Sequence, residues 1–173
     1  PQQAQNAIDE INATHAVFEK YPNLNLIEEQ PGNFNRATSM SVMENLTQKY
    51  SEDEVDWVIG GNDGCAMGAI AAMENAGWTL GFENGGIGVS GIDCNEDASY
   101  AIQEGTLTVS INPDPVSLGY IGAAFLVNYL NDGTLFPAEN VAWPDFQTAE
   151  DVLVDSTNID NYIENLAWWK DPQ

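Results

Sequence analysis

The stretch that decides the fold is VDWVIGGNDGCAMGAIAAMENAG, residues 55–77. It begins with a compact apolar run, residues 55–60, which is typical of a buried strand. A run of small residues follows Asn62-Asp63-Gly64 and predicts a helix over 65–75, with Gly77 as its C-cap. A buried strand that passes directly into a helix is the repeating unit of an α/β sheet.

The same alternation continues on both sides of this stretch. Because buried strands alternate with helices, the sequence predicts a parallel sheet covered on both faces, a three-layer α/β/α architecture. Further strands are predicted at 24–29, 87–92 and 107–111, extended pieces around Val141 and Val152, and helices at 3–21, 35–50, 96–104, 116–131 and 158–169.

Two helices carry apolar stripes that we expect to face the core. The pattern in 3–21 places Ile8, Ile11, His15 and Phe18 on one side, so His15 is expected to be a hydrogen-bonded core histidine. The pattern in 116–131 turns inward a second set, Leu118, Ile121, Phe125 and Leu126.

Charge excludes several classes of partner. The 173 residues include 27 acidic and four basic side chains, a net charge of −23. This charge repels the backbone of nucleic acids and anionic lipid headgroups, so we expect neither as a partner. With 43% hydrophobic residues the chain can form a core. Cys65 and Cys94 are expected to be buried thiols, with a bridge between them as the alternative.

Polar side chains follow the predicted strands, at the edge where open parallel sheets bind ligands. They include amides, carboxylates, a guanidinium and an aromatic ring, a set that suits a neutral polyhydroxylated ligand. The residues that follow the four predicted strands are Asn33 to Arg36, Asn62 and Asp63, Asp93 to Asn95, and Asn112 and Asp114.

Structural roles compete with ligand binding at these positions. Asp63 is expected to be the N-cap of the helix that follows it, and Asp93 could cap the helix at 96. Arg36 could instead relieve acidic repulsion, and Phe34 could belong to the core. With a single histidine and no nucleophile, phosphate or zinc motif, the sequence predicts no enzyme, no catalytic residue, no metal site and no cofactor.

Several motifs follow one another in the sequence: Phe34-Asn35-Arg36, residues 42–46, residues 61–69, Gly91-Ile92-Asp93, residues 101–113 and Gly119-Tyr120. Their order, over about residues 24–131, resembles that of the ribose-binding-protein type of periplasmic binding protein. The resemblance implies one lobe of a type I fold, with residues 1–173 as a single domain and 134–173 as a hinge-proximal tail and terminal helix. It also implies that Phe34 stacks on a sugar while Arg36, Asn62 and Asp93 bond its hydroxyls.

The function that this resemblance implies is that of an extracytoplasmic solute receptor, periplasmic or a cell-surface lipoprotein, which delivers a sugar to the permease of an ABC importer. The effector domain of a LacI-type repressor is the alternative. A glycosidase that uses Asp63 and Asp93 is a third hypothesis.

Two departures from the family pattern lead to further expectations. The family often has glutamine where this chain has Ile111, so Asn112 is taken as the contact from that strand. The N-terminal lobe and the first strand of this lobe are expected to be missing, and an export leader could have been removed. Another chain could therefore complete the sheet, because an unpaired central gap leaves backbone groups without partners.

Overall fold

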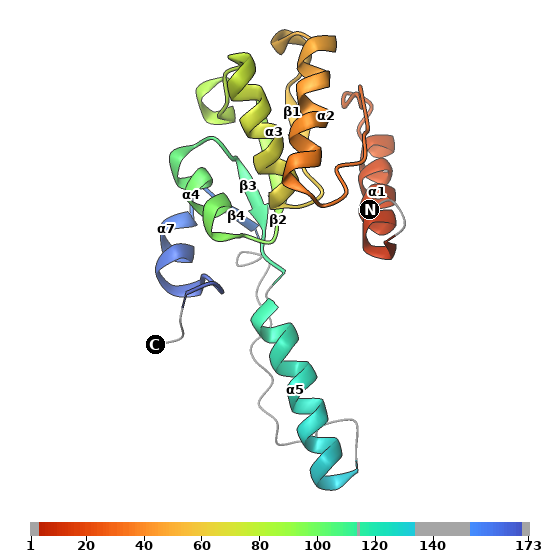
Figure 1. The fold of residues 1–173 in the computed structure, drawn as a ribbon, viewed down its shortest axis with the longest axis vertical. Coiled ribbons are helices and arrows are strands. Elements are labelled where there is room, and N and C mark those ends of the chain that lie inside the picture. The colour runs from red at the N-terminus through yellow and green to blue at the C-terminus, as the bar shows by residue number, and fades with distance from the viewer. Residues whose placement is uncertain (1–3, 114, 134–152, 171–173) are drawn as a thin grey trace.

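The computed structural model describes residues 4–113, 115–133 and 153–170, and its centre is a four-stranded sheet (Figure 1). β2 lies between β1 and β3, and these three strands are parallel. β4 pairs with the other edge of β3 and is antiparallel. The α/β fold class is confirmed. The sequence predicted an extended piece around Val152, next to β4, but not its antiparallel pairing with β3. The strands are β1 (Trp57–Ile59), β2 (Gly88–Ile92), β3 (Val109–Ile111) and β4 (Leu153–Asp155).

Helices α3 and α4 connect the parallel strands, as the alternating pattern predicted. No helix among the described residues is long and apolar enough to cross a membrane. The helices are α1 (Gln5–Lys20), α2 (Arg36–Lys49), α3 (Asp63–Ala76), α4 (Glu96–Glu104), α5 (Pro115–Asp132) and α7 (Ile159–Asn161), with 3-10 turns η1 (Glu52–Glu54) and η2 (Phe82–Asn84) and a π-helical turn η3 (Tyr162–Leu166).

The core lies on one face of the sheet, under α3 and α4. Val89 and Val154 point to this face and are almost completely buried, and Ile102 of α4 packs in the same cluster. α2 packs directly on α3. Gly68 of α3 makes this close approach possible, because a Cβ there would lie 2.3 Å from the carbonyl oxygen of Arg36.

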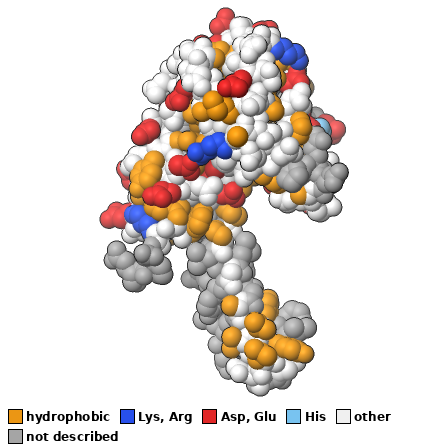
Figure 2. Space-filling view, in the orientation of Figure 1, with side chains coloured by type: hydrophobic (Ala, Val, Ile, Leu, Met, Phe, Trp, Pro, Cys, Tyr) orange, Lys and Arg blue, Asp and Glu red, His pale blue; other side chains and the backbone are white. Residues whose placement is uncertain are grey.

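The opposite face of the sheet is partly exposed. The register aligns Ile59 with Ser90 and Val109, and it aligns Ile111 with Ile92 and Leu153. Ile59 is 53% exposed, Ile111 41% and Leu153 46%. α5 follows β3 but extends away from the sheet (Figure 1), and hydrophobic side chains gather at its far end (Figure 2).

This exposed sheet face predicts binding of a hydrophobic dye. We expect the folded chain to bind Nile red, a neutral dye that a protein with a charge of −23 does not repel. The double variant Ile59→Gln, Ile111→Gln should lose most of the fluorescence while its circular dichroism is unchanged. The matched control Val17→Gln removes an equally exposed apolar side chain from α1 and should keep the fluorescence. Equal fluorescence from all three proteins would mean that the dye binds elsewhere.

Three sequence predictions about local structure are wrong. Residues 24–29 form no strand, because among the described residues no neighbouring strand pairs with them. The predicted core stripe of α1 is not buried as expected: Ile8 is 37% exposed, and His15 is paired at the surface with Glu29 at 2.7 Å, while Ile11 and Phe18 are half-buried. Leu126 is 59% exposed rather than inward, since α5 extends from the sheet.

Other predictions hold or lie outside the description. Cys65 and Cys94 are both buried free thiols, as the sequence favoured. Phe125 is half-buried. The side chains of Leu118 and Ile121 lie outside the described part of the chain, as do Val141 and Val152.

Candidate functional site

Asn62 immediately precedes α3, just after the carboxyl end of β1. Its side-chain oxygen accepts a hydrogen bond from the backbone N–H of Cys65 at 2.9 Å, so Asn62 is the N-cap. The sequence had assigned this cap to Asp63, and that assignment is wrong. Capping uses the amide oxygen of Asn62 and leaves the amide nitrogen as a donor at the edge of the sheet.

Asp63 is the first residue of α3 and is fully buried, where it bonds β3 and the segment before α4. Its carboxylate accepts one bond from the Ser110 hydroxyl at 2.7 Å and another from the Asn95 backbone N–H at 2.7 Å. Burial raises the pKa of Asp63 to about 6, although these two hydrogen bonds favour the ionised form; the nearby charges of Asp93 and Asp97 raise it further. Asp63 therefore holds the ends of β2 and β3 together rather than facing solvent.

Asp93 follows β2 in an unusual backbone conformation. Its φ angle is 115°, and that of Cys94 is 50°. Both values lie in the positive-φ region that residues other than glycine rarely adopt. Asn95, not Asp93, is the residue that begins α4, which removes the capping role considered for Asp93. The half-buried carboxyl of Asp93 has its pKa raised by burial. Strain of this kind persists where surrounding contacts fix it, and it is common at functional sites.

Phe34 and Arg36 reach the same edge of the sheet from the loop before α2 and from its first residue. The ring of Phe34 lies over Gly61, where a Cβ would be 3.5 Å from the ring. The ring is half-buried rather than part of the core. Arg36 pairs with Asp97 in the first turn of α4, two residues after Asn95. The pair is about half exposed, so solvent screens it and it adds little stability.

Glu10 of α1 is a neighbour of this site that the sequence analysis missed. A Cβ at Gly61 would lie 3.9 Å from its carboxylate, and the pKa of Glu10 is raised by burial and by the nearby charge of Asp93. A lone glutamate on an amphipathic helix carries no signal that distinguishes it from a solvated side chain.

Four of the predicted site residues lie around the carboxyl ends of β1 and β2. The Phe34 ring borders Gly61, which precedes Asn62. Arg36 pairs with Asp97 of α4, and Asp63 accepts from the N–H of Asn95, two residues after Asp93. Asn112 follows β3 and differs from the others in being buried, with 2% of its surface exposed. Its role as a ligand contact stays a prediction. Among the described residues no cluster of His, Cys, Asp or Glu is suited to a metal ion.

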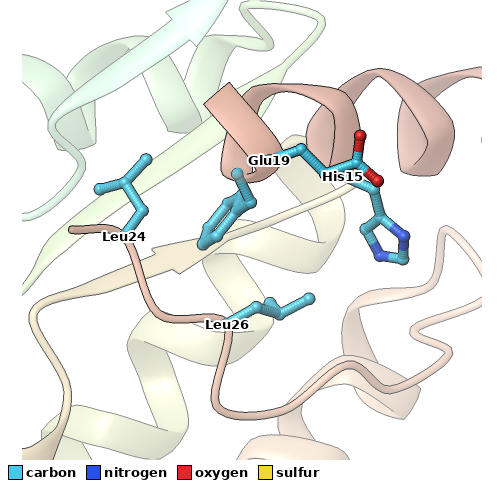
Figure 3. Close-up of a pocket in the computed structure, with 5 residues that line it drawn as sticks. His15, Glu19, Leu24 and Leu26 are labelled. Carbon is cyan, nitrogen blue, oxygen red and sulfur yellow. The ribbon is translucent and has the colours of Figure 1, made fainter. Parts of the chain in front are cut away.

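A separate pocket lies between α1 and the segment that follows it (Figure 3). It is lined by His15, Phe18, Glu19, Leu24 and Leu26. His15 is already paired with Glu29, and the remaining lining is mostly apolar. This pocket shares no residue with the set at the ends of the strands, so we do not include it in the candidate site.

Comparison with known proteins decides the family. Residues 1–134 match the family profile described as a periplasmic binding protein domain. This chain belongs to that family. The family assignment agrees with the resemblance drawn from the motifs.

Individual relatives in the periplasmic binding protein family cover much of this chain. The D-allose-binding periplasmic protein of Escherichia coli K12 is 27% identical over 143 residues, which is 83% of this chain and 43% of that protein. The ribose import binding protein of Salmonella typhimurium LT2 is 31% identical over 57% of this chain and 30% of its own length. The chain thus spans less than half the length of these relatives.

The fold also matches solved structures in the family. An ABC transporter solute-binding protein from Bacillus halodurans C-125, solved with bound myo-inositol, has a TM-score of 0.69 and 25% identity. The match covers 88% of this chain and 47% of that protein. A galactofuranose-binding protein gives a TM-score of 0.72 at 24% identity, over 91% of this chain. Both likenesses support the type I periplasmic binding protein fold.

Proposed function

We propose that this chain is one ligand-binding lobe of an extracytoplasmic sugar receptor, periplasmic or a cell-surface lipoprotein, that serves an ABC importer. The observation that carries the proposal is the placement of Phe34, Arg36, Asn62 and Asp93 around the carboxyl ends of β1 and β2. Carboxylate and guanidinium groups bond sugar hydroxyls, and the aromatic ring covers the C–H face of a sugar. The names of the allose-binding and ribose-binding relatives support this ligand class.

The mechanism is binding without chemistry. A sugar enters between this lobe and a second lobe, the hinge closes, and the closed receptor docks on the permease. Each charge-assisted hydrogen bond to the sugar contributes about 1.5–3 kcal/mol of binding free energy. No covalent bond forms or breaks, and neither a cofactor nor a nucleic acid takes part.

Completion of the sheet by another strand belongs to this proposal. Gly60 donates its N–H to Ser90, and Asp56 accepts from Gly88, so the even-numbered residues of this strand bond to β2. The backbone groups of Trp57 and Ile59 therefore face the outer edge of β1. We propose that a strand from the rest of the receptor or from another chain pairs there, which would satisfy those groups.

A panel of sugars tests the ligand class. The full natural protein that contains this lobe is heated with D-allose, D-ribose, D-apiose and myo-inositol, each in excess. A ligand at 100 times its dissociation constant should stabilise the protein by about 2.7 kcal/mol. Failure of every sugar and polyol to raise the melting temperature would contradict the proposal.

Asp93→Asn tests the site. The variant keeps the shape of the side chain but removes the charge that accepts from a sugar hydroxyl, so we expect at least about tenfold weaker binding by calorimetry. Asp53→Asn is the matched control, because it removes one charge from an exposed position in η1 and should leave the affinity unchanged. Unchanged affinity in both Asp93→Asn and Asn62→Ala would refute the assigned contacts.

A further inference from the structure

The turn that carries Asp93 is held by aromatic residues close to the end of the chain. Trp168 donates its indole N–H to the carbonyl oxygen of Asp93 at 2.8 Å, and Trp169 donates to that of Cys94 at 3.2 Å. The hydroxyl of Tyr162 lies 3.5 Å from the same Cys94 oxygen. We call Tyr162, Trp168 and Trp169 the aromatic clamp. It lies outside residues 1–134, the part that matches the family profile.

The other backbone groups of the turn are also bonded. The N–H of Asp93 donates to Ile111 at 2.8 Å, that of Cys94 to the Ser110 hydroxyl at 3.2 Å, and that of Asn95 to Asp63. The N–H groups are thus fixed by β3 and α3, whereas the clamp bonds the two carbonyl oxygens. The Ser99 hydroxyl of α4 also donates to the Cys94 carbonyl oxygen, at 3.4 Å. Asp93 and Cys94 both have positive φ angles, so their carbonyl groups point in directions that do not occur in a regular strand or helix.

The geometry points to a positioning role for Trp168 and Trp169: by holding the Asp93 and Cys94 carbonyls they keep the turn strained and so aim the Asp93 carboxylate at the ligand. A residue with φ near 115° relaxes towards negative φ unless its surroundings prevent it. Relaxation would rotate the peptide planes on both sides of Asp93 and move its side chain. The inference rests on the proposed function, in which Asp93 is a sugar contact.

The clamp is itself rigidly mounted. Tyr162 is 1% exposed and belongs to the core, and Trp169 packs against the same core cluster. The rings of Trp169 and Tyr100 lie 6.0 Å apart, which attaches the clamp to α4 as well. Rigid second-layer groups of this kind give a binding residue a defined direction and reduce the ordering needed when a ligand binds.

Amide hydrogen exchange tests the clamp without any ligand. Trp168→Phe keeps an aromatic ring but lacks the N–H donor, and we expect exchange in the peptide covering residues 92–96 to become about tenfold faster. Trp169→Phe removes one of the bonds to the Cys94 carbonyl, which Tyr162 and Ser99 also contact, so its effect should have the same direction and be smaller. Exchange in α3 should not change. The matched control Trp57→Phe removes an indole bond to Ser90 on the exposed sheet face and should leave residues 92–96 unchanged.

Sugar affinity then tests the positioning role. In the full natural protein, Trp168→Phe should weaken binding of the best sugar from the panel about tenfold, whereas Trp57→Phe should not. Unchanged exchange in both clamp variants would overturn the inference. A clamp variant with faster exchange but unchanged sugar affinity would also overturn the inference, provided that Asp93→Asn does weaken binding. If Asp93→Asn leaves the affinity unchanged, the contact assigned under the proposed function fails, and the positioning role fails with it.

Discussion

Gly68→Ala is expected to destabilise the lobe by about 3 kcal/mol. The added Cβ would lie 2.3 Å from the Arg36 carbonyl oxygen and 3.0 Å from the backbone nitrogen of Met40. Both neighbours are backbone atoms of α2, so a side-chain rotation cannot relieve the contact. Helix propensity alone predicts the opposite sign, because alanine favours a helix by about 1 kcal/mol over glycine. Urea denaturation followed by circular dichroism measures which effect wins.

The same substitution should also disturb the candidate site. α2 can avoid the clash only by moving its first turn away from α3, and that turn begins with Arg36. Gly119→Ala is the matched control, since nothing lies within 4 Å of its Cβ position in α5. It should leave the free energy of unfolding unchanged or raise it by up to about 1 kcal/mol. If Gly68→Ala is as stable as Gly119→Ala, α2 and α3 do not pack as closely as described.

The helix ends were predictable because their signals are local. Gly77 and Gly105 follow α3 and α4 and adopt positive φ angles of 80° and 82°, a conformation that glycine reaches without strain. The predicted helix over 96–104 has the same bounds as α4. By contrast, residues 24–29 have the alternating pattern of a strand but form none, because a strand needs a neighbouring strand that a local pattern cannot supply.

Only the residues of the candidate site that directly follow a strand could be predicted from the sequence. Asn62 and Asp93 follow apolar runs, so their place at the edge of the sheet could be inferred from the sequence. The division of roles between Asn62 and Asp63 could not, since both side chains are good caps and the backbone conformation decides which one bonds Cys65. The aromatic clamp was also invisible, because Trp168 and Asp93 are 75 residues apart in the sequence.

Asp63 should make the lobe less stable as the pH rises from 4 to 7. Burial raises its pKa from an ordinary 3.8 to about 6. Between these values the folded state binds more protons than the unfolded chain, so the free energy of unfolding falls with rising pH. Its contribution is fully present below about pH 4 and is lost above about pH 6, a change of about 3 kcal/mol.

Asp63→Asn isolates this effect. The amide can accept from Asn95 and donate to the Ser110 hydroxyl, so it keeps two hydrogen bonds without a titratable group. The difference in unfolding free energy between wild type and variant should therefore change by about 3 kcal/mol between pH 4 and pH 7.5, in favour of the variant at the higher pH. Measurement in 1 M NaCl screens repulsion among the surface carboxylates but not a buried charge. A difference for Asp63→Asn that stays constant with pH would mean that Asp63 is not the group that titrates.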